Sequence, residues 1–291
     1  MRDGSHAAHG PGETVRLNYL DWGPRFHPKM LVCVHGLTRQ CRDFDELGKG
    51  LSKDYRIICP DIVGRGRSGW LNDKSAYTLD TYMAHMTDLI EHLGKEQVDW
   101  LGTSMGGLIG MRIAAERPEM IRRLVLNDIG PLLPAAGLQQ IATYVGEDPR
   151  FRSLSEVMAY LRKAHVDFGD LTDAQWSEMT THSVLRMPGG GYALHYDPAI
   201  ATPFKKEPIK DIDLWAIWDE ITCPVLVLRG ERSQLLTDIT ARRMTMRGPK
   251  TTLVEIPGVG HAPALMSADQ IKIVREWLVP EEERPENQLE S

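Results

Sequence analysis

Cysteine is scarce in this sequence: the 291 residues contain four, and no two of them stand in a Cys-x-x-Cys pair. The low number argues against a disulfide framework, and the missing pair argues against the common zinc-binding patterns. A His-Glu-x-x-His motif is also absent, so we expect neither a metal nor a cofactor. Three of the four cysteines lie in or beside apolar, strand-like runs, which favours reduced core thiols in a cytoplasmic protein.

Long apolar runs and an excess of positive charge are missing as well. No run approaches the ~20 residues needed to cross a bilayer, and residues 1–14 lack the apolar core of a secretory signal. The chain carries 34 Lys and Arg against 40 Asp and Glu, a net charge of −6, and such a surface repels phosphate backbones and anionic lipid headgroups. We therefore expect a cytoplasmic protein that acts on a small-molecule substrate, with no nucleic-acid or membrane partner. Association into a homo-oligomer stays open.

Short apolar runs alternate with longer stretches of helical periodicity along most of the chain. Several runs are apolar almost throughout, as is typical of strands buried on both faces of a parallel sheet. We predict strands at residues 15–19, 30–35, 55–59, 98–102, 123–127, 224–229 and 251–256. Helices are predicted at residues 79–93, 105–117, 237–246 and 268–278. This alternation predicts an α/β fold with a doubly wound, mostly parallel sheet.

The alternation stops between residues 130 and 221, where no convincing buried strand is found. A structureless loop of that length is implausible in a compact domain. We therefore predict a helical cap at 130–221, inserted into a core made of residues 1–129 and 222–291. Its helices are expected at 138–145, 154–164 and 174–185. The cap is rich in large aromatic residues, and Trp215 is our candidate for a substrate contact.

The most informative segment is Gly102-Thr-Ser-Met-Gly106, which follows a predicted strand and opens a predicted helix. A serine on such a sharp turn needs small neighbours, because strand and helix backbones approach each other closely there. The turn exposes the Ser104 hydroxyl above the carboxyl ends of the strands. The first N–H of the helix, on Met105, is free to bind a developing oxyanion. Ser104 is therefore our candidate nucleophile.

Three further motifs extend this pattern: Val34-His-Gly-Leu37, Asp61-Ile-Val-Gly-Arg-Gly-Arg-Ser68 and Gly258-Val-Gly-His261. Together with the serine turn, they make the chain resemble an α/β-hydrolase-fold protein over nearly its whole length. The resemblance implies that the Leu37 N–H is the second oxyanion donor. We expect His35 and Asp61 to fix their loops, and we interpret 64–69 as a structural loop rather than a phosphate-binding one, since no helix follows it.

A serine needs a base, and imidazole has a suitable pKa. Of the ten histidines, only His261 lies in a glycine-rich loop after the last predicted strand, where it can reach Ser104. His6 and His9 are expected in an unstructured start, and the others in helices, the cap or other loops. In α/β hydrolases the catalytic serine, acid and histidine follow one another in this order along the chain, and a histidine at 261 agrees with that order.

The acidic residue that should hydrogen-bond to His261 is missing from its usual position in that family. The loop after residues 225–228 has Ser233 and Gln234 where similar proteins carry Asp. Asp128 is our preferred acid, because it ends a predicted core strand and some relatives of the fold place their acid there. Glu231 and Asp238 are the alternative carboxylates, and Gln234 is a neutral alternative.

These residues predict a cofactor-independent serine hydrolase that cleaves a carboxylic ester or lactone through an acyl-enzyme. Hydrolysis of a carbon–carbon bond in a ring-cleavage product is the closest alternative, because that family shares the Ser-Met-Gly-Gly turn. A ligand-binding protein that has kept the fold without catalysis is the alternative from another class.

Overall fold

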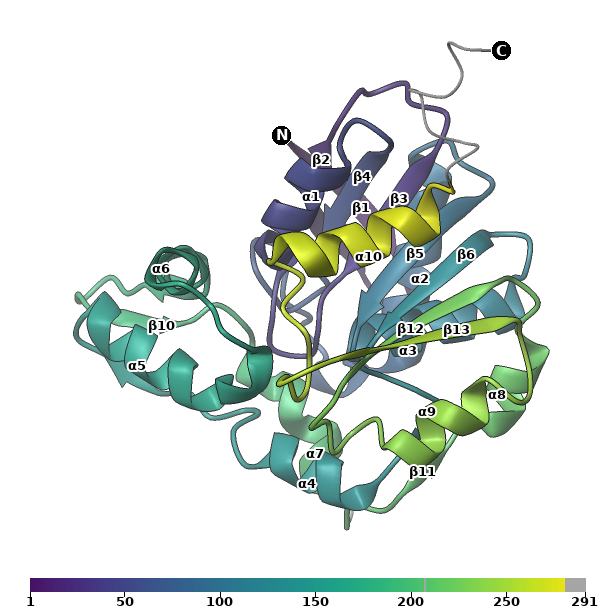
Figure 1. The fold of residues 1–291 in the computed structure, drawn as a ribbon. Coiled ribbons are helices and arrows are strands. Elements are labelled where there is room, and N and C mark those ends of the chain that lie inside the picture. The colour runs from purple at the N-terminus through teal and green to yellow at the C-terminus, as the bar shows by residue number, and fades with distance from the viewer. Residues whose placement is uncertain (207, 281–291) are drawn as a thin grey trace.

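A mostly parallel sheet of eight strands forms the centre of the molecule (Figure 1). The computed structural model describes residues 1–206 and 208–280. In spatial order the strands are β1 (Arg2–His9), β2 (Thr14–Trp22), β4 (Arg56–Pro60), β3 (Met30–Val34), β5 (Val98–Thr103), β6 (Ile121–Asn127), β12 (Val225–Gly230) and β13 (Thr251–Ile256). Pairing is antiparallel from β1 through β2 to β4 and parallel across the rest of the sheet. The predicted α/β class and mostly parallel sheet are confirmed.

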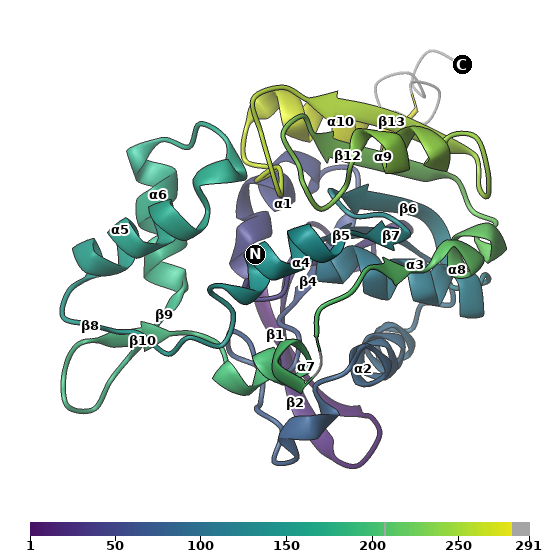
Figure 2. The ribbon, with the colours of Figure 1, turned by 90° about the horizontal axis from the view of Figure 1, so that it is seen from below.

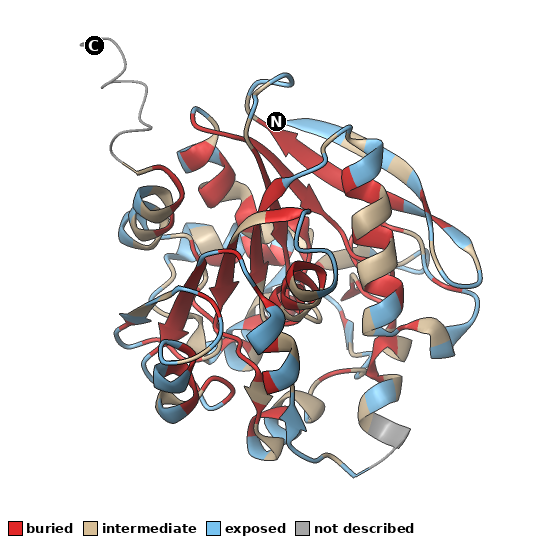
Figure 3. Ribbon diagram, turned by 90° about the vertical axis from the view of Figure 1, so that its right-hand side faces the viewer, coloured by how far each residue is buried: buried red, intermediate tan, exposed pale blue. Residues whose placement is uncertain are grey.

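Helices cover both faces of this sheet, and two apolar clusters fill the layers between them. One cluster packs the sheet against α1 (Asp45–Leu51) and α10 (Ala268–Leu278). The larger cluster packs the other face against α2 (Leu79–His92) and α3 (Met105–Glu116). The inner strands β3, β4 and β12 are buried along their whole length, as Figure 3 shows for the centre of the sheet. None of the described helices has the length and apolar character needed to span a membrane.

In its described residues, the segment 130–221 forms several helices and five short strands. The helices are α4 (Ala135–Ala142), α5 (Leu154–Ala164), α6 (Asp173–His182), α7 (Thr202–Lys206) and α8 (Trp215–Glu220). The strands are β7 (Leu132–Leu133), β8 (Arg150–Phe151), β9 (Val184–Arg186), β10 (Tyr192–Leu194) and β11 (Ile212–Asp213). In Figures 1 and 2, α5, α6 and β8–β10 project to one side, while α4 and α7 lie close to the core. After this segment, α9 (Asp238–Met244) precedes β13.

Two expectations about local structure are wrong. The start of the chain is not unstructured: β1 pairs with β2 from Arg2↔Asp21 to His9↔Thr14. The pairing relies on main-chain hydrogen bonds, which a polar sequence without apolar alternation does not signal. The strands β7–β11 were also not expected; each has only two or three residues, too few for a pattern of period two.

His85 gives a stability prediction for this fold. Its imidazole is buried on α2, and neither ring nitrogen has a hydrogen-bond partner among the residues that the structure describes. Burial lowers the pKa of this ring to about 4, so the folded chain holds it neutral. Below pH 6.5 the unfolded chain binds a proton that the folded chain does not, and stability falls as the pH drops. Between pH 6.5 and 4 this group accounts for about 3 kcal/mol of the loss.

We expect His85→Leu to raise the free energy of unfolding at pH 7 by about 1–2 kcal/mol, because no unsatisfied polar group is then buried. The same variant should lose less stability on acidification than the wild type. Urea unfolding at pH 7 and pH 4.5 measures both effects. A destabilised variant with an unchanged pH dependence would contradict the prediction.

Candidate active site

Ser104 lies at the turn between β5 and α3, in a backbone conformation that L-residues rarely adopt (φ 52°, ψ −116°). The turn is tight because glycines flank it. A Cβ on Gly106 would come within 2.1 Å of the Val34 carbonyl oxygen, and one on Gly102 within 2.3 Å of the Gly106 backbone. The strained turn holds the serine side chain out of the core, at the carboxyl end of the sheet.

The structure brings three of the candidate residues together in one hydrogen-bonded chain. The Ser104 Oγ lies 2.9 Å from Nε2 of His261, and Nδ1 of the same ring lies 2.7 Å from Oδ2 of Asp128. The His261 side chain is 20% exposed, whereas the Asp128 side chain is completely buried. The imidazole thus has a carboxylate on one side and a hydroxyl on the other, the arrangement that lets a histidine take the serine proton.

Asp128 directly follows β6 and also has a positive φ, 55°. Its carboxylate accepts hydrogen bonds from the Gly230 N–H at 2.8 Å and from the Ser233 hydroxyl at 2.5 Å. Because β6 pairs with β12, residues at the ends of these two strands lie side by side. Ser233 therefore supports the carboxylate from the loop in which the resemblance to α/β hydrolases led us to expect the acid itself.

The alternative partners of His261 make other contacts. The Glu231 carboxylate accepts a hydrogen bond from the Gly258 N–H at 2.7 Å, and Asp238 pairs with Arg242 on the surface of α9. Gln234 lines a hollow that also contains His261, but no hydrogen bond joins the two side chains in the described residues. Among these candidates, only Asp128 bonds to the imidazole.

The two candidate oxyanion donors, the Leu37 and Met105 amides, belong to the residues that directly follow Gly36 and Ser104. Gly36 lies against Ser104: a Cβ on it would come 3.7 Å from the serine Cβ. The Leu37 and Met105 N–H groups donate no hydrogen bond within the described part of the chain. Both remain available to an oxygen atom bound at Ser104.

His35 fixes the loop that carries Leu37. Its Nδ1–H donates to the Gly36 carbonyl at 2.8 Å, and its Nε2 accepts from the Ile62 N–H at 3.0 Å. Burial lowers the pKa of His35 to about 3, so the ring stays neutral and can make both bonds. The Gly36 carbonyl shares a peptide plane with the Leu37 N–H, and the histidine thereby sets the direction of that donor.

Two cavities meet at the hydrogen-bonded chain. The apolar cavity, of about 540 Å³, includes Ser104 and Met105 in its wall. Most of its other wall residues are apolar, among them Leu37, Leu108, Ile129, Leu133, Leu138, Ile200 and Phe204. The polar cavity, of about 250 Å³, includes His261 and is lined further by Gln140, Tyr144, Asp167, Arg232 and Gln234. Ile141 and Leu235 border both cavities, so they adjoin.

Trp215 is not part of either cavity wall, so its predicted contact with a substrate has no support. The residue is buried on α8, and its ring faces the guanidinium groups of Arg243 and Arg247 at 4.6 and 4.9 Å. An aromatic residue near the end of an insertion can equally well anchor the insertion to the core. The sequence gives no signal that separates the two roles.

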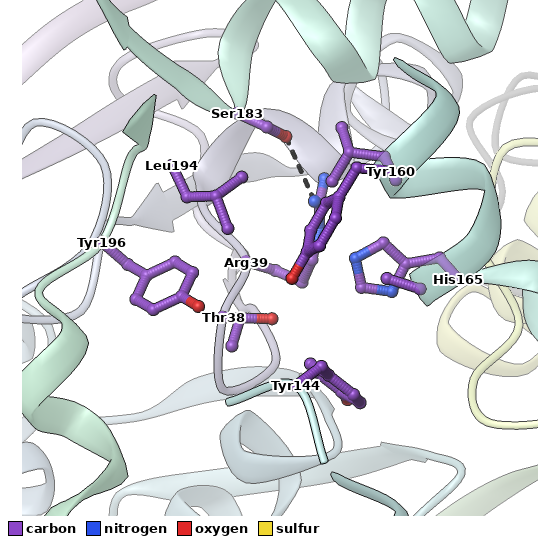
Figure 4. A pocket seen from close by; sticks show the side chains of 10 residues that line it. Thr38, Arg39, Tyr144, Tyr160, His165, Ser183, Leu194 and Tyr196 are labelled. Atoms are coloured by element: carbon purple, nitrogen blue, oxygen red, sulfur yellow. Dashed lines mark hydrogen bonds between the residues drawn. The ribbon is translucent and has the colours of Figure 1, made fainter. Parts of the chain in front are cut away.

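A third, much smaller cavity lies beneath α5 (Figure 4). Its volume of about 20 Å³ is enough for a water molecule and too small for a substrate. Arg39 crosses it, donating to Ser183 at 3.1 Å and to both carboxylate oxygens of Asp43. His165 also faces it, and burial together with Arg39 and His261 holds the pKa of His165 well below the usual value. Sequence reasoning missed both residues, since neither belongs to a recognisable motif.

The described residues contain no cluster of three or more His, Cys, Asp or Glu side chains arranged to hold a metal ion. All four cysteines are buried and free of disulfides.

Comparison with known proteins gives consistent results. A family model described as alpha/beta hydrolase fold matches residues 29–266. The 3-hydroxybutyrate-oligomer hydrolase of Cupriavidus necator is 42% identical, over 92% of this chain and 94% of that protein. The 2-hydroxymuconate semialdehyde hydrolase of a Pseudomonas species is 34% identical, over 51% of this chain and 53% of that protein. The crystal structure of an alpha/beta hydrolase from Novosphingobium aromaticivorans superposes with a TM-score of 0.84 at 34% identity, covering 95% of this chain and 97% of that one.

Proposed function

Because this chain belongs to the alpha/beta hydrolase fold family and is a hydrolase, we propose that it cleaves carboxylic esters or lactones of small, partly apolar hydroxy acids through an acyl-enzyme on Ser104. The observation that carries the proposal is the continuous hydrogen-bonded chain from Ser104 through His261 to Asp128. A serine hydroxyl paired in this way becomes a nucleophile at neutral pH without a metal or a cofactor.

In the proposed reaction, the Ser104 Oγ bonds to the carbonyl carbon while its proton passes to His261 Nε2. The carbonyl electron pair moves to oxygen, and the resulting oxyanion accepts hydrogen bonds from the Leu37 and Met105 amides. The tetrahedral species then collapses, and the leaving alkoxide takes the proton from Nε2. Water repeats the sequence on the acyl-enzyme and releases the acid. Asp128 stabilises the imidazolium in both halves of the reaction.

The two cavities suggest how a substrate would lie. Ser104 and Met105 line the apolar cavity, so the acyl portion would extend there. His261, which protonates the leaving oxygen, lines the polar cavity, so the alcohol portion would occupy that side. An ester joining two hydroxy acids has an acyl group and a polar alcohol group of this kind. The name of the Cupriavidus necator relative, a 3-hydroxybutyrate-oligomer hydrolase, supports this substrate class.

A direct comparison of substrates tests the proposal. We expect the purified protein to hydrolyse a linear dimer of 3-hydroxybutyrate and p-nitrophenyl butyrate. A vinylogous diketone of the ring-cleavage type should react far more slowly. The Pseudomonas relative makes this carbon–carbon alternative the relevant competitor. If the protein hydrolyses the diketone but neither ester, the carbon–carbon alternative replaces the proposal. If the folded protein hydrolyses none of these compounds, the proposal is refuted.

Leu108 gives a prediction about chain length. It lies one helical turn after Ser104 on α3, and its half-buried side chain lines the apolar cavity. Each methylene buried there contributes about 0.8 kcal/mol to binding. We expect Leu108→Trp to fill the space and to lower the kcat/KM ratio of p-nitrophenyl octanoate to p-nitrophenyl acetate by about tenfold.

The matched control is Leu154→Trp, because Leu154 is 38% exposed at the start of α5 and outside both cavity walls. This variant should leave the octanoate-to-acetate ratio unchanged. An unchanged ratio in Leu108→Trp would show that the acyl chain does not enter the apolar cavity.

A further inference from the structure

Arg65 is fully buried in the loop after β4, and its guanidinium has no carboxylate partner within the described chain. The guanidinium instead donates hydrogen bonds to three neutral oxygen atoms: the Leu37 and Val63 carbonyls, each at 2.8 Å, and the Tyr82 hydroxyl at 2.9 Å. Its cationic carbon also lies 4.8 Å from the centre of the Tyr82 ring and 5.9 Å from that of Tyr77. Burying a cation without a counter-ion destabilises a fold, so the residue calls for a functional reason.

The contacts of this guanidinium point to one region of the molecule. Its Nε–H donates to the carbonyl of Leu37, and one of its terminal nitrogens lies 3.5 Å from the Met105 sulfur. Leu37 and Met105 are the two residues whose amides are the candidate oxyanion donors. Leu37 lies in the loop after β3 and Met105 is the first residue of α3, and Arg65 contacts the carbonyl of the one and the side chain of the other.

The loop that carries Arg65 is itself held firmly. Arg65 forms a β-bridge with Tyr196, the Gly66 N–H donates to the His195 carbonyl at 3.0 Å, and the Asp197 N–H donates to the Gly64 carbonyl at 2.8 Å. Beneath it, the Asp61 carboxylate accepts from the Cys41 and Arg67 amides at 2.8 and 2.9 Å. The cation is therefore fixed between the core and the segment 195–197, and it cannot turn to solvent.

We propose that Arg65 is a positioning residue of the oxyanion site: its hydrogen bond to the Leu37 carbonyl fixes the loop that carries one donor, and its buried positive charge, held against Leu37 and Met105, favours the negative charge that develops on the substrate oxygen. The inference rests on the proposed function, because it needs an oxyanion to form beside Ser104. In a site of low dielectric, a fixed cation acts strongly on a nearby anion and weakly on a neutral carbonyl. Its effect should therefore fall on the transition state and not on ground-state binding.

Three variants separate the charge from the hydrogen bonds. Arg65→Met removes both, Arg65→Gln keeps a donor for the Leu37 carbonyl, and Arg65→Lys keeps the charge. We expect kcat for p-nitrophenyl butyrate to fall about 100-fold in the methionine and glutamine variants and about tenfold in the lysine variant, with KM within about threefold of the wild type. Arg67→Met is the control, since Arg67 lies two residues away on the same loop with a half-exposed side chain paired to Asp3. It should behave as the wild type does.

A ligand pair provides a readout that a purely structural role would not change. A trifluoromethyl alkyl ketone adds the Ser104 oxygen and becomes an anionic hemiketal, whereas the matching methyl ketone binds as a neutral molecule. In Arg65→Met and Arg65→Gln, the inhibition constant of the trifluoromethyl ketone should rise by the factor by which kcat/KM falls, while that of the methyl ketone stays constant. If the methionine variant does not fold, the glutamine and lysine variants decide the question by the same comparison.

The inference would be overturned if Arg65→Met and Arg65→Gln kept both the inhibition constant of the trifluoromethyl ketone and the kcat/KM of the wild type. Equal weakening of both ketones would also overturn it, because the defect would then not concern the oxyanion. A wild-type protein that neither hydrolyses the ester nor forms the hemiketal would refute the proposed function itself, which distinguishes the two failures.

Discussion

Asp128→Asn is expected to lower kcat about 10⁴-fold with little change in KM. The direction follows from the contacts of the carboxylate. The Gly230 N–H donates to Oδ1, so the amide oxygen of an asparagine would stay there and its NH₂ group would face His261 and Ser233. The ring would then accept at Nδ1 and carry its proton on Nε2. That tautomer cannot take a proton from Ser104.

A carboxylate placed at position 233 instead of 128 should restore part of the lost kcat. The Ser233 hydroxyl lies 2.5 Å from Oδ2 of Asp128, in the loop after β12. We expect Ser233→Asp, added to Asp128→Asn, to recover about tenfold or more of kcat. Steady-state kinetics with p-nitrophenyl butyrate measure each step.

Glu231→Gln is the matched control for the acid. The Glu231 carboxylate binds the Gly258 N–H and not the imidazole, so this variant should keep kcat within about threefold of the wild type. A loss in Glu231→Gln as large as that in Asp128→Asn, or near-normal turnover by Asp128→Asn, would show that the assigned acid is wrong.

Ser104→Ala is expected to produce the largest loss, about 10⁶-fold in kcat, because no covalent intermediate can form. Binding of a neutral substrate analogue should be preserved, since both cavities stay intact. The wild type should react with a fluorophosphonate at Ser104, as a mass increase on the peptide containing this residue, whereas the variant should not react. Modification of a different residue, or turnover by the variant above about a thousandth of the wild-type rate, would contradict the assignment.

The strained turn adds a test of stability at the same position. Ser104 has φ 52° and ψ −116°, a conformation that glycine adopts without strain. Ser104→Gly should therefore unfold with a free energy about 1 kcal/mol higher than that of Ser104→Ala, while both remain inactive. Urea denaturation of the two variants measures the difference. Equal stability would mean that the turn stores no strain.

The sequence was sufficient to predict the parallel part of the sheet, because the buried parallel strands are short apolar runs that local periodicity reveals. It also indicated Ser104 as the candidate nucleophile, since the serine turn is a local feature: small residues two positions before and after it, between a strand and a helix. His261 followed from its place after the last strand. The structure brings these two side chains to 2.9 Å of each other, across 157 positions in the chain.

Other features depended on contacts between distant segments. The strand β1 exists because its main chain pairs with β2, and its side chains carry no apolar alternation that would announce it. The substrate contact predicted for Trp215 stays a prediction, because composition identifies an aromatic residue as buried but does not tell which surface buries it.

What the sequence by itself determined is the set of elements whose signals are local: the order of strands and helices, the serine turn and the glycine-rich loops. Only the tertiary structure decided which carboxylate lies against His261, because Asp128 and Ser233 meet through the pairing of β6 with β12. It likewise decided the division of the site into an apolar and a polar cavity, and the burial of Arg65 against the Leu37 carbonyl and the Met105 side chain. Each of these is a relation between residues far apart in the chain, and a periodic pattern contains no information about such distances.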